Sequence, residues 1–163
     1  MFQAGDKVVY PMHGAGIIDR IEDREILGRK QSYYIMHLPI GSMDVMIPTA
    51  PEHGGGLRAV VDAERARAVL QHLGEVEEDE TSNWNKRYRD NMLRLKGGEL
   101  EEVARVVKSL LTRESGRSLS TSERKMLVSA RQILVSELVL ALDLEKDAVE
   151  TQIDEALAAQ RAK

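Results

Sequence analysis

The sequence predicts an α+β protein, with a small antiparallel β-barrel at the N-terminus and a compact bundle of about five α-helices after it. The first sixty residues are rich in Val, Ile and Tyr and are interrupted by Gly and Pro, which is typical of short strands joined by turns. From Asp62 onward the apolar residues recur with the period of a helix. We therefore expect a β-domain over residues 1–61 and a helical domain over residues 62–163.

Turn residues such as Pro11, Gly28 and Pro39 divide the first part into segments that are expected to form strands. The expected strands cover residues 6–10, 16–26, 32–38, 45–48 and 57–61. Short strands at this spacing favour a small, curled barrel of the Tudor or SH3 type. Because such a barrel is close to the lower size limit for independent folding, we expect it to dock on the rest of the chain.

The helices are predicted from their apolar stripes and their capping residues. Asp62 suits the start of the first helix, and Ser82 or Asn83 suits the start of the second, which should end at the pair Gly97-Gly98. The fourth helix opens with Ser120-Thr121-Ser122-Glu123, in which hydroxyl and carboxylate are expected to satisfy each other's backbone N–H groups. The expected helices cover residues 62–73, 84–96 and 99–113, a stretch from 120 to about 142, and residues 145–159, with an acidic loop over 75–80.

Composition excludes several classes of protein. The chain has 163 residues and no Cys, so neither a disulfide framework nor a thiolate metal site is expected. No run of about 18 apolar residues is present and the N-terminus lacks a secretory pattern, so we expect a cytoplasmic protein without a membrane span. The four His residues are scattered, and no phosphate-binding loop or nucleophile signature occurs. We expect no metal, no cofactor and no enzymatic activity, although a paired-carboxylate site remains open.

Positive charge is concentrated around the single Trp residue. The whole chain has a net charge of −4, yet residues 83–131 hold twelve Lys and Arg against six Asp and Glu. Basic side chains displace the counterions of phosphates, and an aromatic ring can wedge between bases. This pattern indicates a nucleic-acid contact without sequence readout, in which Trp84 supplies the wedge. The phosphate-binding candidates are Lys86, Arg87, Arg89, Arg124 and Lys125.

A second interpretation stays open at this point. Trp84, Tyr88, Met92 and Leu95 share one face of the expected helix, so Trp84 could belong to the hydrophobic core, and the basic run could be an ordinary solvated face. The protein would then be a protein–protein adaptor without direct DNA contact.

Three segments resemble the CarD/CdnL family of bacterial transcription regulators. They are FxxGDKVVYPxHG at residues 2–14, NWxxRY at residues 83–88, and LSxxERKMLxxARQIL at residues 119–134. The resemblance spans nearly the whole chain in the order expected for the family. It implies a Tudor-like module that binds the β subunit of RNA polymerase and a helical domain that contacts promoter DNA at the upstream fork of the melted bubble. Such a protein is a general factor, expected to act as a monomer, that stabilises the open promoter complex.

The resemblance also implies roles for individual residues. Trp84 matches the wedging tryptophan of the family, Lys86, Arg87 and Arg89 match its DNA-backbone contacts, and Arg124 and Lys125 lie in a second basic segment. Its polymerase-binding face would include three residues of the N-terminal domain, Arg24, Met46 and Pro48. Met46 departs from relatives that carry arginine at this position, and it would replace a charge-assisted contact by an adaptable apolar one.

Overall fold

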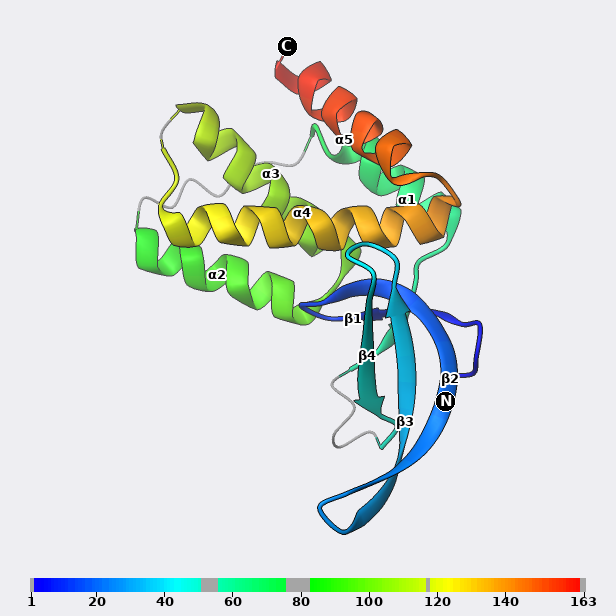
Figure 1. Ribbon diagram of the computed structural model, residues 1–163. Helices are drawn as coiled ribbons and strands as arrows, with labels where there is room; N and C mark the ends of the chain where they lie inside the picture. Colours follow the sequence, from blue (N-terminus) through cyan, green and yellow to red (C-terminus); the bar gives the residue numbers. More distant parts are fainter. Residues whose placement is uncertain (1, 51–55, 76–82, 117, 162–163) are drawn as a thin grey trace.

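A computed structural model describes residues 2–50, 56–75, 83–116 and 118–161 of the chain (Figure 1). Within these residues five strands are followed by five helices, as the sequence predicts: β1 (Lys7–Tyr10), β2 (Gly14–Ile26), β3 (Arg29–Leu38), β4 (Met43–Pro48), β5 (Arg58–Ala59), α1 (Ala63–His72), α2 (Trp84–Gly97), α3 (Leu100–Gly116), α4 (Thr121–Leu142) and α5 (Lys146–Arg161). The α+β fold class is confirmed. Apart from Glu75, the expected acidic loop lies outside the described residues, as does Ser82.

The strands form one antiparallel sheet in the order β4-β3-β2-β1-β5. The sheet is strongly curled, as the bend of β2 makes plain (Figure 1). It is open rather than closed into a barrel, because β4 and β5 are its two edges and are not paired with each other among the described residues. The concave core of this domain is apolar and consists of Val8, Ile18, Tyr34, Met36, Leu38 and Ile47.

The helices pack around α4, which contacts α1, α3, α5 and β2. Capping fixes where α2 begins and ends: the Asn83 side chain accepts from Lys86 N at 3.2 Å, and Gly98 takes a left-handed conformation with φ of 76°. Gly adopts that conformation without a steric penalty, so the glycine pair stops the helix where the sequence predicts. Ser120 caps α4 by accepting from Glu123 N at 3.1 Å.

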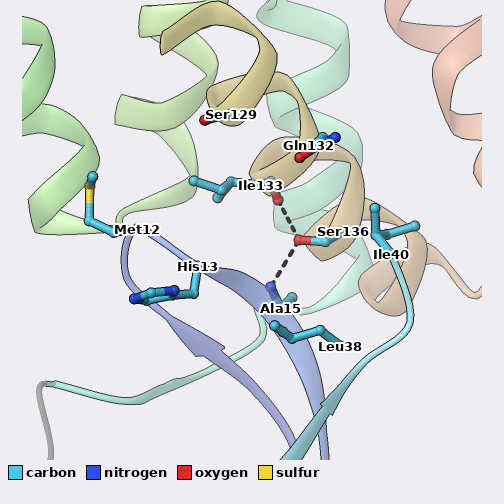
Figure 2. A pocket seen from close by; sticks show the side chains of 9 residues that line it. All are labelled: Met12, His13, Ala15, Leu38, Ile40, Ser129, Gln132, Ile133 and Ser136. Carbon is cyan, nitrogen blue, oxygen red and sulfur yellow. Dashed lines mark hydrogen bonds between the residues drawn. The ribbon is translucent and has the colours of Figure 1, made fainter. Parts of the chain in front are cut away.

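The sheet docks directly on α4, as expected for so small a β-domain. Ser136, which is buried on α4, accepts from Ala15 N at 2.9 Å and donates to Ile133 O at 2.7 Å. Figure 2 shows these two bonds among the side chains that line a cavity. The cavity has a volume of about 140 Å³ and lies between the β1–β2 turn, the end of β3 and α4. The backbone approach is close at this point, since a Cβ on Gly14 would lie 2.9 Å from Ser136 Oγ.

Candidate nucleic-acid interface

The N-termini of α2 and α4 lie at the same end of the helical bundle (Figure 1). The indole of Trp84, the first residue of α2, bridges them: its Nε1–H donates to Glu123 Oε1 at 3.0 Å and lies 3.3 Å from Ser120 Oγ. Backbone N–H groups at helix N-termini carry partial positive charge that favours phosphate. This end of the bundle therefore combines an aromatic ring with an electrostatic setting suited to a polyanion.

Trp84 is not part of the hydrophobic core. The residue is 40% exposed, which contradicts the interpretation that it lies in the interior. One face of the indole stacks on Tyr88, with ring centroids 5.2 Å apart and an interplanar angle of 14°. Exposure then falls along the same stripe, through the half-buried Met92 to Leu95, which is only 2% exposed. One face of the ring is thus covered by Tyr88 and its N–H edge is hydrogen-bonded to Glu123, while the residue remains partly exposed to solvent.

Arg87 differs from the expectation that it contacts a phosphate. It is only 7% exposed, and its guanidinium pairs with the carboxylate of Glu123, with Nε 3.1 Å from Oε2. Glu123 is itself 2% exposed. Burial opposes ionisation of this carboxylate, but the hydrogen bond and charge of Arg87, aided by the Trp84 N–H, outweigh it, so the pKa of Glu123 lies below its ordinary value. Arg87 therefore compensates a buried charge inside the protein.

The other four predicted basic residues are exposed: Lys86 and Arg89 on the first turns of α2, and Arg124 and Lys125 on the first turn of α4. Lys86 Nζ lies 3.8 Å from Asp90 Oδ2 one turn later, a solvent-exposed pair of small energetic weight. The remaining three form no ion pair with any residue that the structure describes. They are available to an external anion.

The three predicted polymerase-binding residues lie together on one face of the sheet. Cross-strand register pairs Ile35 with Met46 and Tyr33 with Pro48, and directly opposed side chains point to the same side. The register Arg24↔Gln31 places Arg24 on that side too, because Gln31 and Tyr33 are two residues apart. This outer face is opposite to the concave core, and Met46 is 41% exposed on it, in the edge strand β4.

Arg24 is part of a charged row along β2. Glu22 accepts from Arg24 Nε at 2.9 Å and from Arg20 Nε at 2.5 Å. The hydrogen bond from Arg24 has the larger effect and that from Arg20 adds to it, and together they hold the pKa of Glu22 below its ordinary value. The outer face therefore carries guanidinium groups on β2 and the apolar side chains of Met46 and Pro48 on the edge strand β4.

The sequence did not indicate that Glu123 connects Trp84 with Arg87. We expected its carboxylate to return to the backbone of Ser120, but the structure uses it for Arg87 and Trp84 instead. The available signal was the single carboxylate in the first turn of an otherwise basic helix start, since Glu123 precedes Arg124 and Lys125.

Neither a metal-binding group of His, Asp or Glu side chains nor a helix long and apolar enough to cross a membrane is found within the described parts of the chain.

Comparison with known proteins assigns both parts of the chain to one family. Residues 2–61 match the family model described as CarD-like/TRCF RID domain, and residues 68–154 match the model described as CarD, C-terminal domain. The chain belongs to the CarD/CdnL family. It is also 42% identical over 138 residues to a Bacillus subtilis (strain 168) protein named "Putative transcription factor YdeB", a match that covers 85% of this chain and 90% of that relative. Family and relative together indicate a CarD-like transcription factor.

Proposed function

We propose that this CarD-like protein binds the β subunit of RNA polymerase and stabilises the open promoter complex through sequence-independent contacts at the upstream fork of the bubble. The observation that carries the proposal is Trp84: a half-exposed indole fixed between two helix N-termini whose first turns carry exposed Lys and Arg. Its activity is binding rather than catalysis, and it acts as a cytoplasmic monomer without metal or cofactor.

The helical domain, residues 62–163, supplies the DNA contact. Lys86, Arg89, Arg124 and Lys125 contact backbone phosphates, which positions the protein without reading sequence. Trp84 intrudes at the distorted step where duplex meets separated strands, and stacking of this kind contributes roughly 1–3 kcal/mol. Because the ring finds such a step only at a fork, its contact favours the melted promoter over closed duplex, and only a difference of this kind can shift the equilibrium.

The N-terminal domain, residues 1–61, binds the polymerase. An edge strand presents unpaired backbone groups that a partner strand can extend. β4 is such an edge, and Met46 and Pro48 on it share the outer face of the sheet with Arg24. A strand of the polymerase β subunit docked here would pair with the backbone of β4 and cover these side chains.

Attachment to polymerase explains how an acidic protein can act on DNA. The net charge of −4 disfavours binding to free duplex. Once the N-terminal domain is bound, the basic end of the bundle is held at an effective concentration of about millimolar near one junction. At this effective concentration, individually weak contacts with DNA are sufficient to stabilise the open complex.

The test is a promoter-melting assay with purified polymerase, in which the lifetime of the open complex is measured with wild type, with Trp84→Ala and without the protein. We expect wild type to lengthen the lifetime, and Trp84→Ala to lose most of that gain while keeping its affinity for polymerase and nearly its melting temperature. A matched control is Leu93→Ala, which removes another exposed apolar side chain of α2, 61% exposed, away from the stripe of Trp84. Equal lifetimes with and without wild-type protein would refute the proposal, and equal activity of Trp84→Ala would favour an adaptor without DNA contact.

A further inference from the structure

The carboxylate of Glu123 is shared by the residues around the indole. Its Oε1 accepts from Trp84 Nε1 at 3.0 Å, while its Oε2 accepts from Arg87 Nε at 3.1 Å. The Ser120 hydroxyl lies 3.4 Å from Oε1 and caps the same helix turn. Glu123 itself is held firmly, because it is 2% exposed and stands in the first turn of α4.

These contacts restrict both ways in which the indole could move. Stacking on Tyr88 limits tilting of the ring out of its plane, and the hydrogen bond to Glu123 limits rotation within the plane. We propose that Glu123 is a positioning residue, which holds the N–H edge of Trp84 inward so that the opposite edge is presented at a fixed angle to DNA. The inference rests on the proposed function, since it concerns the same wedge.

Arg87 acquires a role in this arrangement that differs from contact with phosphate. A carboxylate hydrogen-bonds an N–H more strongly than a neutral acceptor, but an uncompensated buried carboxylate near DNA would be costly and would repel phosphates. The Arg87 guanidinium removes both problems because it neutralises Glu123 within the protein. The pair therefore provides a strong acceptor for the indole without a net negative charge at the interface.

Pre-orientation has a measurable consequence. A side chain that must be immobilised on binding loses rotamer freedom, and Trp84 in its restrained state has lost most of this freedom beforehand. Releasing the indole from Glu123 is expected to shorten the open-complex lifetime about two- to tenfold, which corresponds to the usual cost of fixing one side chain. This loss is smaller than the loss caused by removing the ring.

The test compares two double variants that both eliminate the buried charge pair. Arg87→Met with Glu123→Gln keeps an oxygen that can accept from the indole, whereas Arg87→Met with Glu123→Met does not. Trp84 is the single Trp of the chain, so time-resolved fluorescence anisotropy reports the motion of this indole alone. We expect a fast, wide-angle component and a two- to tenfold shorter lifetime with the Met/Met variant, and near wild-type values of both with the Met/Gln variant, at similar melting temperatures.

The inference is overturned if the indole stays equally restrained in the Met/Met variant, or if it becomes mobile while the open-complex lifetime is unchanged. A second test leaves the charge pair intact and replaces Trp84 with benzothienylalanine, which keeps the shape of the ring but has sulfur in place of the N–H donor. It should shorten the lifetime by a similar factor, and an unchanged lifetime would also overturn the inference. Failure of the proposed function is distinguishable, because wild type would then give no lifetime gain whatever the anisotropy shows.

Discussion

Arg58 and Glu137 join the sheet to the helical bundle through two hydrogen bonds, of 2.6 and 2.7 Å, between the guanidinium of one and the carboxylate of the other. Arg58 lies on β5, and Glu137, which is 2% exposed, lies on α4. The same carboxylate accepts from Val61 N at 3.0 Å, and Arg58 also donates to Gly98 O, at the end of α2, at 2.6 Å. This ion pair and its hydrogen bonds thus connect β5, α4 and the end of α2, the helix that carries Trp84. A partner bound to the sheet would therefore also hold Trp84 in a defined position.

Arg58→Ala is expected to destabilise the protein by about 3–5 kcal/mol, because it leaves the buried carboxylate of Glu137 without its charged partner. Arg24→Ala is the control, since it removes an exposed guanidinium from β2, and it should cost less than 1 kcal/mol. Denaturant unfolding measures both. If the junction couples the two domains, Arg58→Ala should also broaden the transition or separate it into two. A loss as small as that of the control would show that the junction does not depend on this pair.

The contribution of Glu123 to stability should vary with pH only in acid. Because the pKa of Glu123 is lowered in the folded protein, its contribution is fully present above the unfolded value of about 4.3 and is lost as the pH falls through the lower folded value. Other carboxylates, such as Glu22 and Glu101, titrate in the same direction. The difference between wild type and Arg87→Met with Glu123→Gln isolates the pair. We expect this difference in free energy of unfolding to be constant from pH 6 to 8 and to change below about pH 4.5; a change near neutrality would contradict the prediction.

The local sequence determined the helix ends but not the partners of the charged side chains. Asn83, Gly98 and Ser120 act where their residue types predict, because capping depends on neighbours within four positions. Burial of Arg87 could not be predicted in this way. It lies with Asn91 and Leu95 at four-residue spacing on the inner face of α2, but only the distant Glu123 makes an arginine acceptable there.

The last strand shows the same limit. Residues 57–61 were expected to be extended throughout, but β5 covers only Arg58–Ala59. Backbone bonding to β1 ends with Val60 N, which donates to Lys7 O at 3.0 Å, because Val61 N turns to the Glu137 carboxylate on α4 rather than to a neighbouring strand. Similarly, the face shared by Arg24, Met46 and Pro48 follows from strand register, which residue spacing alone did not specify.

Close backbone contact makes Gly16 essential to the sheet. A Cβ at this position would lie 2.3 Å from His37 O, a backbone atom of β3 that cannot move aside without breaking the pairing. Gly16→Ala is therefore expected to cost about 3 kcal/mol or more and to disorder the β2–β3 pairing. Gly97→Ala is the control, because nothing lies within 4 Å of a Cβ there and the residue is helical, so it should be neutral or stabilise by about 0.5–1 kcal/mol. Circular dichroism and thermal unfolding would detect the difference in stability between Gly16→Ala and Gly97→Ala. Equal stability of the two variants would refute the prediction.

Charge reversal should separate DNA contact from folding. Lys86→Glu with Arg89→Glu, or Arg124→Glu with Lys125→Glu, is expected to shorten the open-complex lifetime and to reduce its dependence on salt, while polymerase binding is retained. The physical reason is that all four side chains are exposed at the N-termini of α2 and α4. The control is Arg105→Glu with Arg67→Glu, which changes the net charge by the same amount at positions on α3 and α1. It should shorten the open-complex lifetime much less. Equal effects of all three pairs would indicate a response to net charge instead of a local interface.

The two faces of β4 offer a matched test of the polymerase-binding surface. Met46 is 41% exposed and pairs with Ile35 on the outer face, whereas Met43 is 54% exposed and pairs with Leu38, which belongs to the concave core. A carboxylate in place of Met46 would be desolvated beneath a docked partner strand, so Met46→Asp is expected to weaken binding to the polymerase β subunit about tenfold or more. Met43→Asp introduces the same charge on the same strand but not on the outer face, and it should bind nearly as wild type. Titration of both variants against the isolated β-subunit fragment or the whole polymerase gives the two dissociation constants. The outer face is the wrong surface if Met43→Asp binds more weakly than Met46→Asp, because the sheet would then meet its partner along the other side of the edge.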